Sequence, residues 1–375
     1  MIPLNAALSN TRYFPLILYL TPIMLDPVLA AFGFPQSTPV TPFGNGLINR
    51  TWRLTSEKDD FILQRVNDDV FSDPLAIAQN IDQIGAWLQH HHPGAAFSHP
   101  LRSLDGQSMI HLPGQGFFRI YPFIRDSFTT DLVDTPGQAY EAAKKFGEFT
   151  HHLSGFPAGR LTATLPGFHD LSLRYRSFRE SLKKGNPQRI TKAATLIDYL
   201  ESLSNLVEEY DRITRNPSFR LRVTHHDTKI SNVLFDGQGK GLCVIDLDTV
   251  MPGYFISDLG DMFRTYLSPV TEEEADCSKI LIRQPVFTAI VKGYLEFMRA
   301  ELTPDEKKAF LYAGEFMMYM QSLRFLTDYL NDDIYYGSRY KGHNYVRALN
   351  QATLLQRFRE LKPELNDSLS RSISL

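Results

Sequence analysis

Two short segments in the second half of the chain constrain its fold more than any other feature. Residues 224–235 read THHDTKISNVLF, and residues 244–248 read VIDLD. Within them, Asp227 and Asn232 are five residues apart, and Asp246 follows Asn232 by fourteen residues. Residues 232–236 and 242–247 have the pattern of β-strands, and the glycine-rich residues between them predict a hairpin. Such a hairpin would return the chain so that Asp246 lies beside Asp227 and Asn232.

These residue types are suited to phosphoryl transfer. That reaction needs an oriented hydroxyl, charge neutralisation and Mg²⁺, a cation that prefers oxygen ligands. We therefore expect Asp227 to be the catalytic base and Asn232 and Asp246 to be the metal ligands. Lys229 is placed to offset charge on the moving phosphate. An aspartate in a turn often only caps backbone groups, but this spacing followed by a hairpin is a far narrower pattern.

Composition limits the class of protein. The 375 residues are 43% hydrophobic and 22% charged, which is ordinary for a globular chain long enough for two lobes. A net charge of −3 argues against nucleic acid or anionic membrane as a partner. Two cysteines give neither a disulfide framework nor zinc spacing, so we expect a cytoplasmic protein.

The N-terminal residues 1–24 are expected to be an extension outside the folded lobes. Residues 14–24 form the most apolar run, which is too short to span a bilayer and contains two prolines. A signal peptide is the weaker interpretation. Met24 is an alternative start of the protein.

Residues 25–124 are expected to form a small, β-rich, nucleotide-binding lobe. Gly44 and Gly46 predict a turn between two strands, where backbone amides can approach phosphates. A plain hairpin turn at residues 45–46 is the alternative.

The next predicted strand, residues 60–66, lacks the lysine that kinases place there. Arg65 is the candidate replacement. Asp82 is its candidate acidic partner, on a helix that is predicted over residues 73–90 with Asp73 as its N-cap. A surface arginine and a solvated aspartate are the alternatives.

Residues 125–375 are expected to form a mostly helical lobe that carries the catalytic and acceptor sites. Capping boxes begin the helices predicted over residues 135–153 and 303–330. Further helices are predicted over residues 175–184, 190–211, 285–301 and 346–359, and residues 366–375 are expected to fray. After the hairpin, Asp258 begins another helix, where it either caps the helix or holds the catalytic loop by hydrogen bonds.

The region around Arg324 is the candidate acceptor site. This arginine lies among apolar residues and needs a partner, which is either Asp328 one turn later or a substrate oxygen. Residues 333–345 follow and are rich in tyrosine, including Tyr335. Aromatic faces with hydroxyls and an arginine suit a sugar-like polyol, although packing between lobes is the simpler interpretation.

Together these motifs resemble the aminoglycoside phosphotransferase and choline kinase-like superfamily, and more closely its N-acetylhexosamine 1-kinases. The resemblance covers nearly everything after about residue 25. It is carried by residues 44–51, 62–64, 222–232, 245–253, 324–330, 333–335 and 343–347. It implies an α+β, bilobal protein-kinase-like fold that uses ATP and Mg²⁺. The reaction implied is transfer of the γ-phosphate to the anomeric hydroxyl of a hexosamine.

The resemblance also implies roles for individual residues. Asp227 matches the catalytic base, Asn232 and Asp246 match magnesium ligands, and Arg324 and Tyr335 match positions that hold the sugar. Asn49, with Gly44 and Gly46, is expected to bind the nucleotide. Asp248 and Asp258 are expected to hold the site residues in position without contacting the substrate. Two departures are Leu47, where the sugar kinases carry histidine, and Arg65, which follows Gln64 where the strand varies within the family. His226 replaces the glycine that is usual in antibiotic kinases, which argues against an antibiotic substrate.

Other functions stay open on the sequence alone. One is a kinase of another alcohol, such as an aminoglycoside, choline, ethanolamine or a homoserine-like molecule. Another is a catalytically silent nucleotide-binding protein. A third is a metal-dependent hydrolase that uses His225, His226 and Asp227. The expected partner is a small-molecule sugar or alcohol, with no nucleic acid or membrane, and the expected state is a monomer or homodimer.

Overall fold

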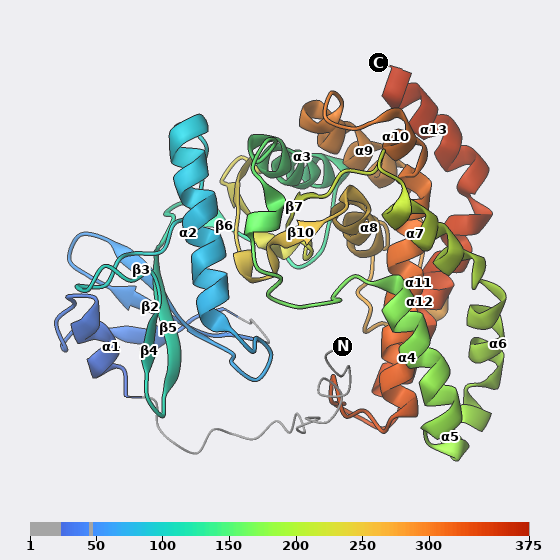
Figure 1. Ribbon diagram of the computed structural model, residues 1–375, viewed down its shortest axis with the longest axis horizontal. Helices are drawn as coiled ribbons and strands as arrows, with labels where there is room; N and C mark the ends of the chain where they lie inside the picture. Colours follow the sequence, from blue (N-terminus) through green and yellow to red (C-terminus); the bar gives the residue numbers. More distant parts are fainter. Residues whose placement is uncertain (1–23, 45–47, 375) are drawn as a thin grey trace, which may run out of the picture.

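The computed structural model describes residues 24–44 and 48–374, which form a small lobe built on a sheet and a large, mostly helical lobe (Figure 1). The predicted α+β architecture of two lobes is confirmed. Residues 1–23 and Gly46 lie outside the described residues, as does Leu47. The expectations placed on them stay predictions.

The small lobe is a five-stranded antiparallel sheet with the strand order β1-β2-β3-β5-β4. Its strands are β1 (Val40–Pro42), β2 (Arg50–Thr55), β3 (Asp60–Val66), β4 (Ile110–Leu112) and β5 (Gly116–Pro122). A short helix, α1 (Asp26–Ala31), covers one face through a compact apolar cluster. Leu63 of β3 and Ile120 of β5 belong to that cluster and are fully buried.

Helix α2 (Pro74–His91) stands between the sheet and the large lobe (Figure 1). The predicted N-cap is confirmed, because the Asp73 side chain accepts a hydrogen bond from the backbone N–H of Ala76. The apolar residues of α2 join the main core of the large lobe rather than the small apolar cluster under α1. Asn80 of α2 also donates to the backbone oxygens of Thr162 and Val250, at 2.8 and 3.2 Å.

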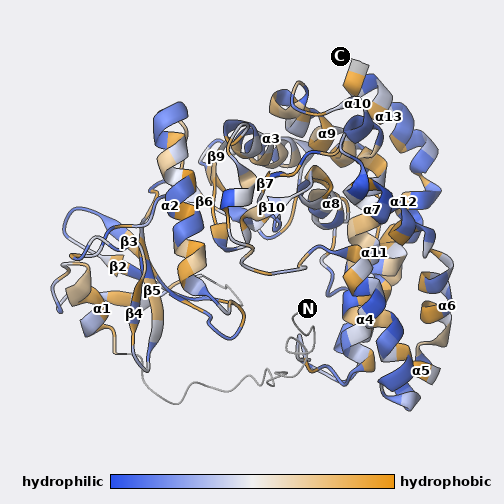
Figure 2. Ribbon diagram, viewed as in Figure 1, coloured by the Kyte–Doolittle hydropathy of each residue, from blue (hydrophilic) through white to orange (hydrophobic). Residues whose placement is uncertain are grey.

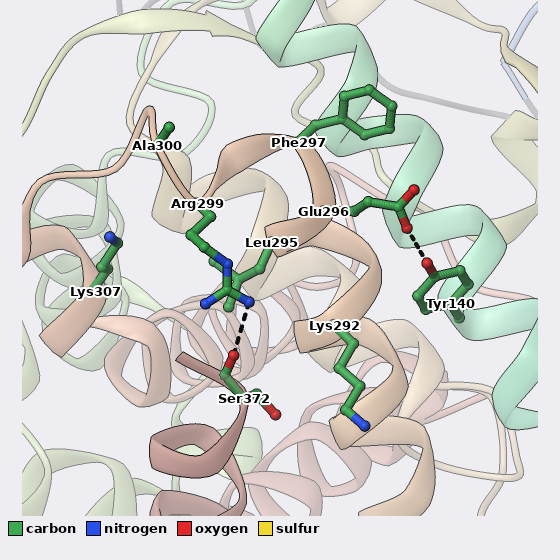
Figure 3. A pocket seen from close by; sticks show the side chains of 9 residues that line it. All are labelled: Tyr140, Lys292, Leu295, Glu296, Phe297, Arg299, Ala300, Lys307 and Ser372. Carbon is green, nitrogen blue, oxygen red and sulfur yellow. Dashed lines mark hydrogen bonds between the residues drawn. The ribbon is translucent and has the colours of Figure 1, made fainter. Parts of the chain in front are cut away.

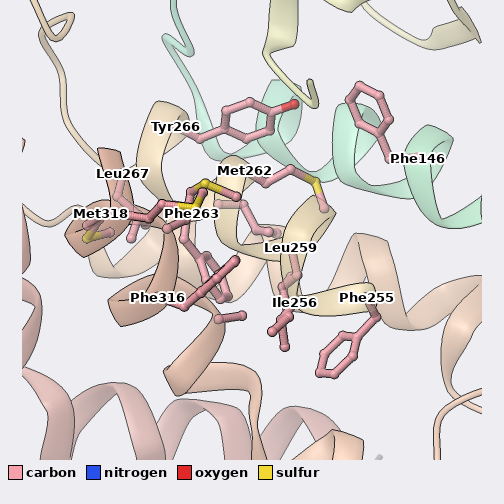
Figure 4. Packing of buried hydrophobic residues seen from close by; sticks show 14 of the residues in the cluster. Phe146, Phe255, Ile256, Leu259, Met262, Phe263, Tyr266, Leu267, Phe316 and Met318 are labelled. Carbon is pink, nitrogen blue, oxygen red and sulfur yellow. The ribbon is translucent and has the colours of Figure 1, made fainter. Parts of the chain in front are cut away.

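The large lobe packs helices around one continuous apolar core, and hydrophilic residues are frequent along its outer helices α12 (His343–Glu360) and α13 (Lys362–Ser374) (Figure 2). Figure 4 shows part of that core, where Phe263 of α8 and Phe316 of α11 lie among other apolar side chains. The helices are α3 (Pro136–His152), α4 (Leu171–Lys184), α5 (Pro187–Lys192), α6 (Ala194–Ser202), α7 (Asn205–Arg215), α8 (Phe255–Tyr266), α9 (Gln284–Met298), α10 (Pro304–Lys308), α11 (Phe310–Leu330), α12 (His343–Glu360) and α13 (Lys362–Ser374). No helix in the described part of the chain is long and apolar enough to cross a membrane.

Short strands and 3-10 turns carry the catalytic segments. The strands are β6 (Ser127–Phe128), β7 (Arg222–Thr224), β8 (Val233–Asp236), β9 (Gly241–Val244) and β10 (Met251–Gly253), and the 3-10 turns are η1 (Ala158–Arg160), η2 (Ile230–Asn232), η3 (Leu247–Thr249) and η4 (Cys277–Lys279). The predicted hairpin is confirmed as β8 and β9, which pair antiparallel. Strand β7 pairs with β10, so the segments before and after the hairpin also lie side by side.

The helix expectations need three corrections. The helix predicted over residues 303–330 is divided at Ala309, although its capping box of Thr303 and Glu306 is present. Glu306, within α10, is fully buried and pairs with the guanidinium of Arg222 of β7. The helix predicted over residues 190–211 is divided into three. The expected fraying of residues 366–375 is wrong up to residue 374, because Leu369 packs in the core and α13 is helical.

Two glycines allow α3 and α9 to pack closely. A Cβ built on Gly293 of α9 would lie 2.3 Å from the backbone oxygen of Tyr140, and one built on Gly147 of α3 would lie 2.8 Å from that of Tyr294. Both neighbouring atoms are backbone, so they cannot rotate away. The close approach of the two helices therefore depends on the missing side chains.

We expect Gly293→Ala to lower the free energy of unfolding by about 1–3 kcal/mol, because the added methyl group forces the helices apart. Alanine otherwise favours a helix over glycine, so the clash must outweigh that gain. Urea denaturation measures the effect. Gly137→Ala in the first turn of α3 is the matched control, since its Cβ meets only ordinary contacts. A Gly293→Ala protein as stable as that control would contradict the packing argument.

Candidate active site

Helix α8 holds the loop that carries Asp227. The Asp258 carboxylate accepts hydrogen bonds from the backbone N–H groups of His225 and His226, at 2.9 and 2.8 Å. Asp261 accepts from the backbone N–H of Thr228 at 2.9 Å. The bonding expected of Asp258 is therefore present, and Tyr254 occupies the N-cap position instead. Sequence reasoning missed Asp261, although its spacing of three residues from Asp258 places both on one face of a helix.

Asp227 is held between an ammonium group and an amide. Its Oδ1 lies 3.0 Å from Nζ of Lys229, and Nδ2 of Asn232 donates to its Oδ2 at 3.2 Å and to its backbone oxygen at 2.8 Å. Loss of water around the carboxylate opposes ionisation, but the Lys229 charge outweighs it and lowers the pKa of Asp227. The carboxylate is therefore ionised at neutral pH and able to accept a proton.

Asp246 follows β9 in a left-handed backbone conformation, with φ of 59°. Its side chain is accessible to solvent. The protein around the Asp246 carboxylate removes part of its hydration, and the carboxylates of Asp248 and Asp227 repel its charge. Both effects raise the pKa of Asp246, to about 7. A divalent cation would relieve this concentration of negative charge.

The residues present fit a magnesium ion. The amide nitrogen of Asn232 is engaged by Asp227, which leaves its Oδ1 as an oxygen ligand. The Asp246 carboxylate supplies a second oxygen. Magnesium in such sites commonly takes one or two protein carboxylates, and substrate phosphates and water complete the shell.

Of the residues expected to bind nucleotide, Asn49 is joined most directly to this site. Its Nδ2 donates to Oδ2 of Asp248 at 2.7 Å, and Asp248 is almost fully buried. Gly44 is exposed and has φ of 76°, a conformation that glycine adopts without strain. The small lobe thus reaches Asp248, two residues after Asp246.

The ion pair expected between Arg65 and Asp82 is not formed. Asp82 pairs instead with Arg102, at 2.9 Å, and accepts from the Ser108 hydroxyl. Arg65 donates to the backbone oxygen of Gln115 at 2.6 Å. The reason lies in strand geometry, since successive side chains of a strand point to opposite faces of the sheet. Arg65 and Gln64 therefore project from opposite faces of β3.

Arg119 is a site residue that the sequence did not reveal. It lies directly opposite Gln64 on β5, and its guanidinium pairs with Oδ1 of Asp248 at 2.5 Å. The register that sets Arg119 against Gln64 depends on pairing between strands more than fifty residues apart.

His225 and His226 are engaged in bonds that hold the loop, which argues against the hydrolase alternative. The Nε2 of His225 lies 3.0 Å from the backbone oxygen of Ile245, and its Nδ1 receives the N–H of Asp227. His226 contacts the Thr224 hydroxyl through Nε2 at 2.7 Å and the Ser257 hydroxyl through Nδ1 at 2.7 Å. Among the described residues, no group of three or more His, Cys, Asp or Glu side chains could hold a metal.

The burial of His226 predicts a pH-dependent stability. Loss of water lowers the pKa of His226 to about 4, below the ordinary value near 6.5. The unfolded chain therefore binds a proton that the folded chain does not, and the contribution of His226 to stability is lost as pH falls from 6.5 toward 4.

We expect the stability advantage of the wild type over His226→Asn to shrink by about 2 kcal/mol between pH 7.5 and pH 5. Asparagine tolerates the left-handed backbone at this position, where φ is 64°, so the comparison isolates the imidazole. Urea denaturation of both proteins at the two pH values measures the difference. A difference that is constant with pH would contradict a neutral, buried His226.

The candidate acceptor region adjoins the loop through Phe168 and His169. The guanidinium of Arg324 stacks over the rings of Phe168 and Tyr336, at 4.9 and 5.5 Å from their centroids. His169 contacts the Ser257 hydroxyl and the ring of His226, which precedes Asp227. Arg324 is therefore linked to the catalytic loop by a short series of side-chain contacts.

The alternative partner of Arg324, Asp328, is ruled out. Asp328 accepts from the backbone N–H groups of Tyr335 and Tyr336, at 2.7 and 2.9 Å, and so holds the turn that carries both tyrosines. Arg324 donates to Gln321 instead. Tyr335 is 51% exposed and available to a ligand.

A second guanidinium lies beside Arg324. Arg174 of α4 donates to the backbone oxygen of Phe168 at 3.2 Å, and loss of water on burial, together with the Arg324 charge, lowers the pKa of Arg174. Within the described ranges, no carboxylate forms an ion pair with either arginine. The Nε of Arg174 is buried without a hydrogen-bond partner, and so is the hydroxyl of Tyr336. The region therefore contains two guanidinium groups without an ion-pair partner in the described part of the chain and is rich in hydrogen-bond donors.

A surface pocket of about 830 Å³ lies elsewhere on the large lobe, between α3, α9 and the end of α13 (Figure 3). Tyr140 and Glu296 form a hydrogen bond at one side of it, and Arg299 donates to the backbone oxygen of Ser372 at the other. It shares no residue with the catalytic loop.

Comparison with known proteins defines the class. The model of the phosphotransferase enzyme family matches residues 39–276, and the chain belongs to that family. The match covers more than half of the chain and defines it as a member of a family of phosphotransferases.

Three solved structures are similar in fold. An aminoglycoside phosphotransferase from Alicyclobacillus acidocaldarius is 12% identical, with a TM-score of 0.62 over 94% of this chain and 98% of that one. A microcompartment-associated aminopropanol kinase is 13% identical, with a TM-score of 0.61 over 91% and 97%. A spectinomycin phosphotransferase in complex with ADP and spectinomycin is 13% identical, with a TM-score of 0.56 over 91% and 100%. The predicted protein-kinase-like fold is confirmed.

Proposed function

We propose that this protein transfers the γ-phosphate of ATP to the anomeric hydroxyl of an N-acetylhexosamine. The observation that supports the reaction best is the arrangement at Asp227, an ionised carboxylate held by Lys229 and Asn232 near Asp246. In this proposal Asp227 accepts the proton of the sugar hydroxyl, and Lys229 offsets charge on the phosphate as it moves. Magnesium held by Asn232 and Asp246 would neutralise charge on the ATP phosphates.

The acceptor is proposed from the charge of its region. Arg174 and Arg324 would repel a cationic acceptor such as choline, ethanolamine or an aminoglycoside. A neutral molecule rich in oxygen atoms suits this region better. It could accept hydrogen bonds from the two guanidinium groups, contact the exposed Tyr335 ring and bond to the Tyr336 hydroxyl. An N-acetylated hexosamine has no positive charge and offers hydroxyl and carbonyl acceptors.

The deciding experiment measures ADP release with magnesium and ATP across a panel of acceptors. The panel contains hexoses, N-acetylhexosamines, the matching free hexosamines, amino alcohols and aminoglycosides. We expect turnover with an N-acetylhexosamine, phosphate on its anomeric oxygen, and much weaker turnover with the free amine of the same sugar. Turnover restricted to an amino alcohol or aminoglycoside would reject the sugar and keep the kinase. A protein that binds nucleotide but phosphorylates none of these would favour the silent alternative.

Asp246→Ala tests the proposed metal site separately. We expect it to weaken binding of magnesium–ADP while binding of ADP without metal changes little, because the ligand lost contacts only the cation. Isothermal titration calorimetry with and without magnesium measures both. Equal loss under the two conditions would argue against metal ligation by Asp246.

A further inference from the structure

The guanidinium of Arg119 is the most deeply buried charge at the junction of the two lobes. Its residue is 1% exposed and lies in the middle of β5. An arginine remains charged in proteins, so burying it is costly without an anion and satisfied donors. The contacts that balance this charge therefore indicate what the residue does.

Within the small lobe, Gln64 orients Arg119. The Nε and NH2 groups of the guanidinium both donate to Oε1 of Gln64, at 3.0 and 2.9 Å. The two residues face each other across β3 and β5 on one side of the sheet. Gln64 is neutral, so it fixes the plane of the guanidinium and leaves its charge for another partner.

That partner belongs to the other lobe. The NH1 of Arg119 pairs with Oδ1 of Asp248, and Asn49 donates to the remaining carboxylate oxygen at 2.7 Å. The backbone oxygen of Asp248 accepts the hydroxyl of Thr164 at 2.8 Å. The carboxylate of Asp248 is thus held by two parts of the small lobe, and its backbone oxygen by the large lobe.

The position of Asp248 gives this pair a consequence for the site. Asp248 lies in η3, whose preceding residue is Asp246, the proposed metal ligand. Kinases commonly use an ion pair between a strand lysine and a helix acid to place the nucleotide phosphates. In this chain β3 carries no lysine, and the α2 acid, Asp82, is bound to Arg102.

We propose that Arg119 and Asp248 form the ion pair that positions the metal-binding loop against the small lobe, with Gln64 as the residue that orients the arginine. In this role Arg119 is a positioning residue that acts through Asp248 on Asp246. The inference rests on the proposed function, because it assigns the pair to binding of magnesium–nucleotide.

The test is calorimetric titration of wild type, Arg119→Lys, Arg119→Gln and Asp248→Asn with ADP, with and without magnesium. We expect each variant to bind magnesium–ADP about 10- to 100-fold more weakly, the range seen when residues that support a metal ligand are replaced. Binding of ADP alone should change much less. Arg119→Lys keeps the charge but not the planar guanidinium. Weaker binding of magnesium–ADP by this variant would therefore show that the geometry of the ion pair matters as well as its charge. Arg102→Gln is the matched control on the same lobe and should bind like wild type.

The outcomes separate this inference from the proposed function. Wild-type binding of magnesium–ADP in all three variants overturns the inference and leaves the proposed kinase intact. A wild-type protein that binds no magnesium–ADP overturns both. If Arg119→Gln fails to fold, the titrations of Arg119→Lys and Asp248→Asn still test whether the ion pair supports binding of magnesium–ADP. An equal loss with and without magnesium in those two variants would mean general disruption of the lobe junction and would overturn the inference.

Discussion

Replacing Asp227 by asparagine is expected to reduce kcat by about 10²–10⁴-fold, the range attributed to a positioned general base. The variant keeps the size of the side chain but cannot accept the proton of the acceptor hydroxyl. Binding of magnesium–ADP should change little, because the proposed metal ligands are Asn232 and Asp246. Steady-state turnover with the best acceptor and calorimetric binding of the nucleotide give the two measurements.

Asp236→Asn is the matched control for that experiment. Asp236 ends β8 and accepts the backbone N–H groups of Gln238 and Lys240 through Oδ1, which an asparagine oxygen can still do. We expect this control to keep wild-type turnover. Undiminished turnover in Asp227→Asn would instead show that Asp227 is not the catalytic base, although it lies in the catalytic loop.

Asp258→Ala is expected to lower the free energy of unfolding by about 4 kcal/mol. The substitution leaves the backbone N–H groups of His225 and His226 buried without acceptors, and each such group costs about 1–3 kcal/mol. The conformation around Asp227 would be lost with them, so turnover should fall as well. Urea denaturation at pH 7.5 measures the first effect.

The exposed Asp131 supplies the comparison, since Asp131→Ala should change stability by no more than about 0.5 kcal/mol. If Asp258→Ala unfolds at the same urea concentration as Asp131→Ala, α8 does not hold the loop in the way described. A stable variant with lost turnover would instead limit the role of Asp258 to the local shape of the loop.

The spacing of residues predicted the core of the candidate site because that part is local in sequence. Asp227, Asn232 and Asp246 are joined by one turn and one hairpin, and both are legible from glycine positions and strand patterns. Arg119 could not be found in this way, because its place depends on the register between β3 and β5. Arg65, one residue after Gln64, was the nearest cation along the chain, but strand alternation turns it to the other face.

Helix boundaries show the same limit. Local signals correctly placed the capping boxes of Thr135 and Thr303 and the N-cap of Asp73. They did not show that the helix following Thr303 is divided at Ala309, or that Glu306 is buried against Arg222 of a distant strand. The polar residues after residue 366 likewise carried no local sign of the core contacts that make α13 a stable helix.

The attachment of α2 to the large lobe determines which elements would separate if the two lobes moved apart. Its apolar face joins the large core, and Asn80 donates to backbone oxygens of the large lobe. Helix α2 precedes the boundary expected at residue 124 but packs on the large lobe, so we expect it to open together with that lobe. If the sheet separates from the rest, α2 should remain behind, and its backbone amides would exchange with deuterium at the slow rate of α3 rather than at the rate of the strands.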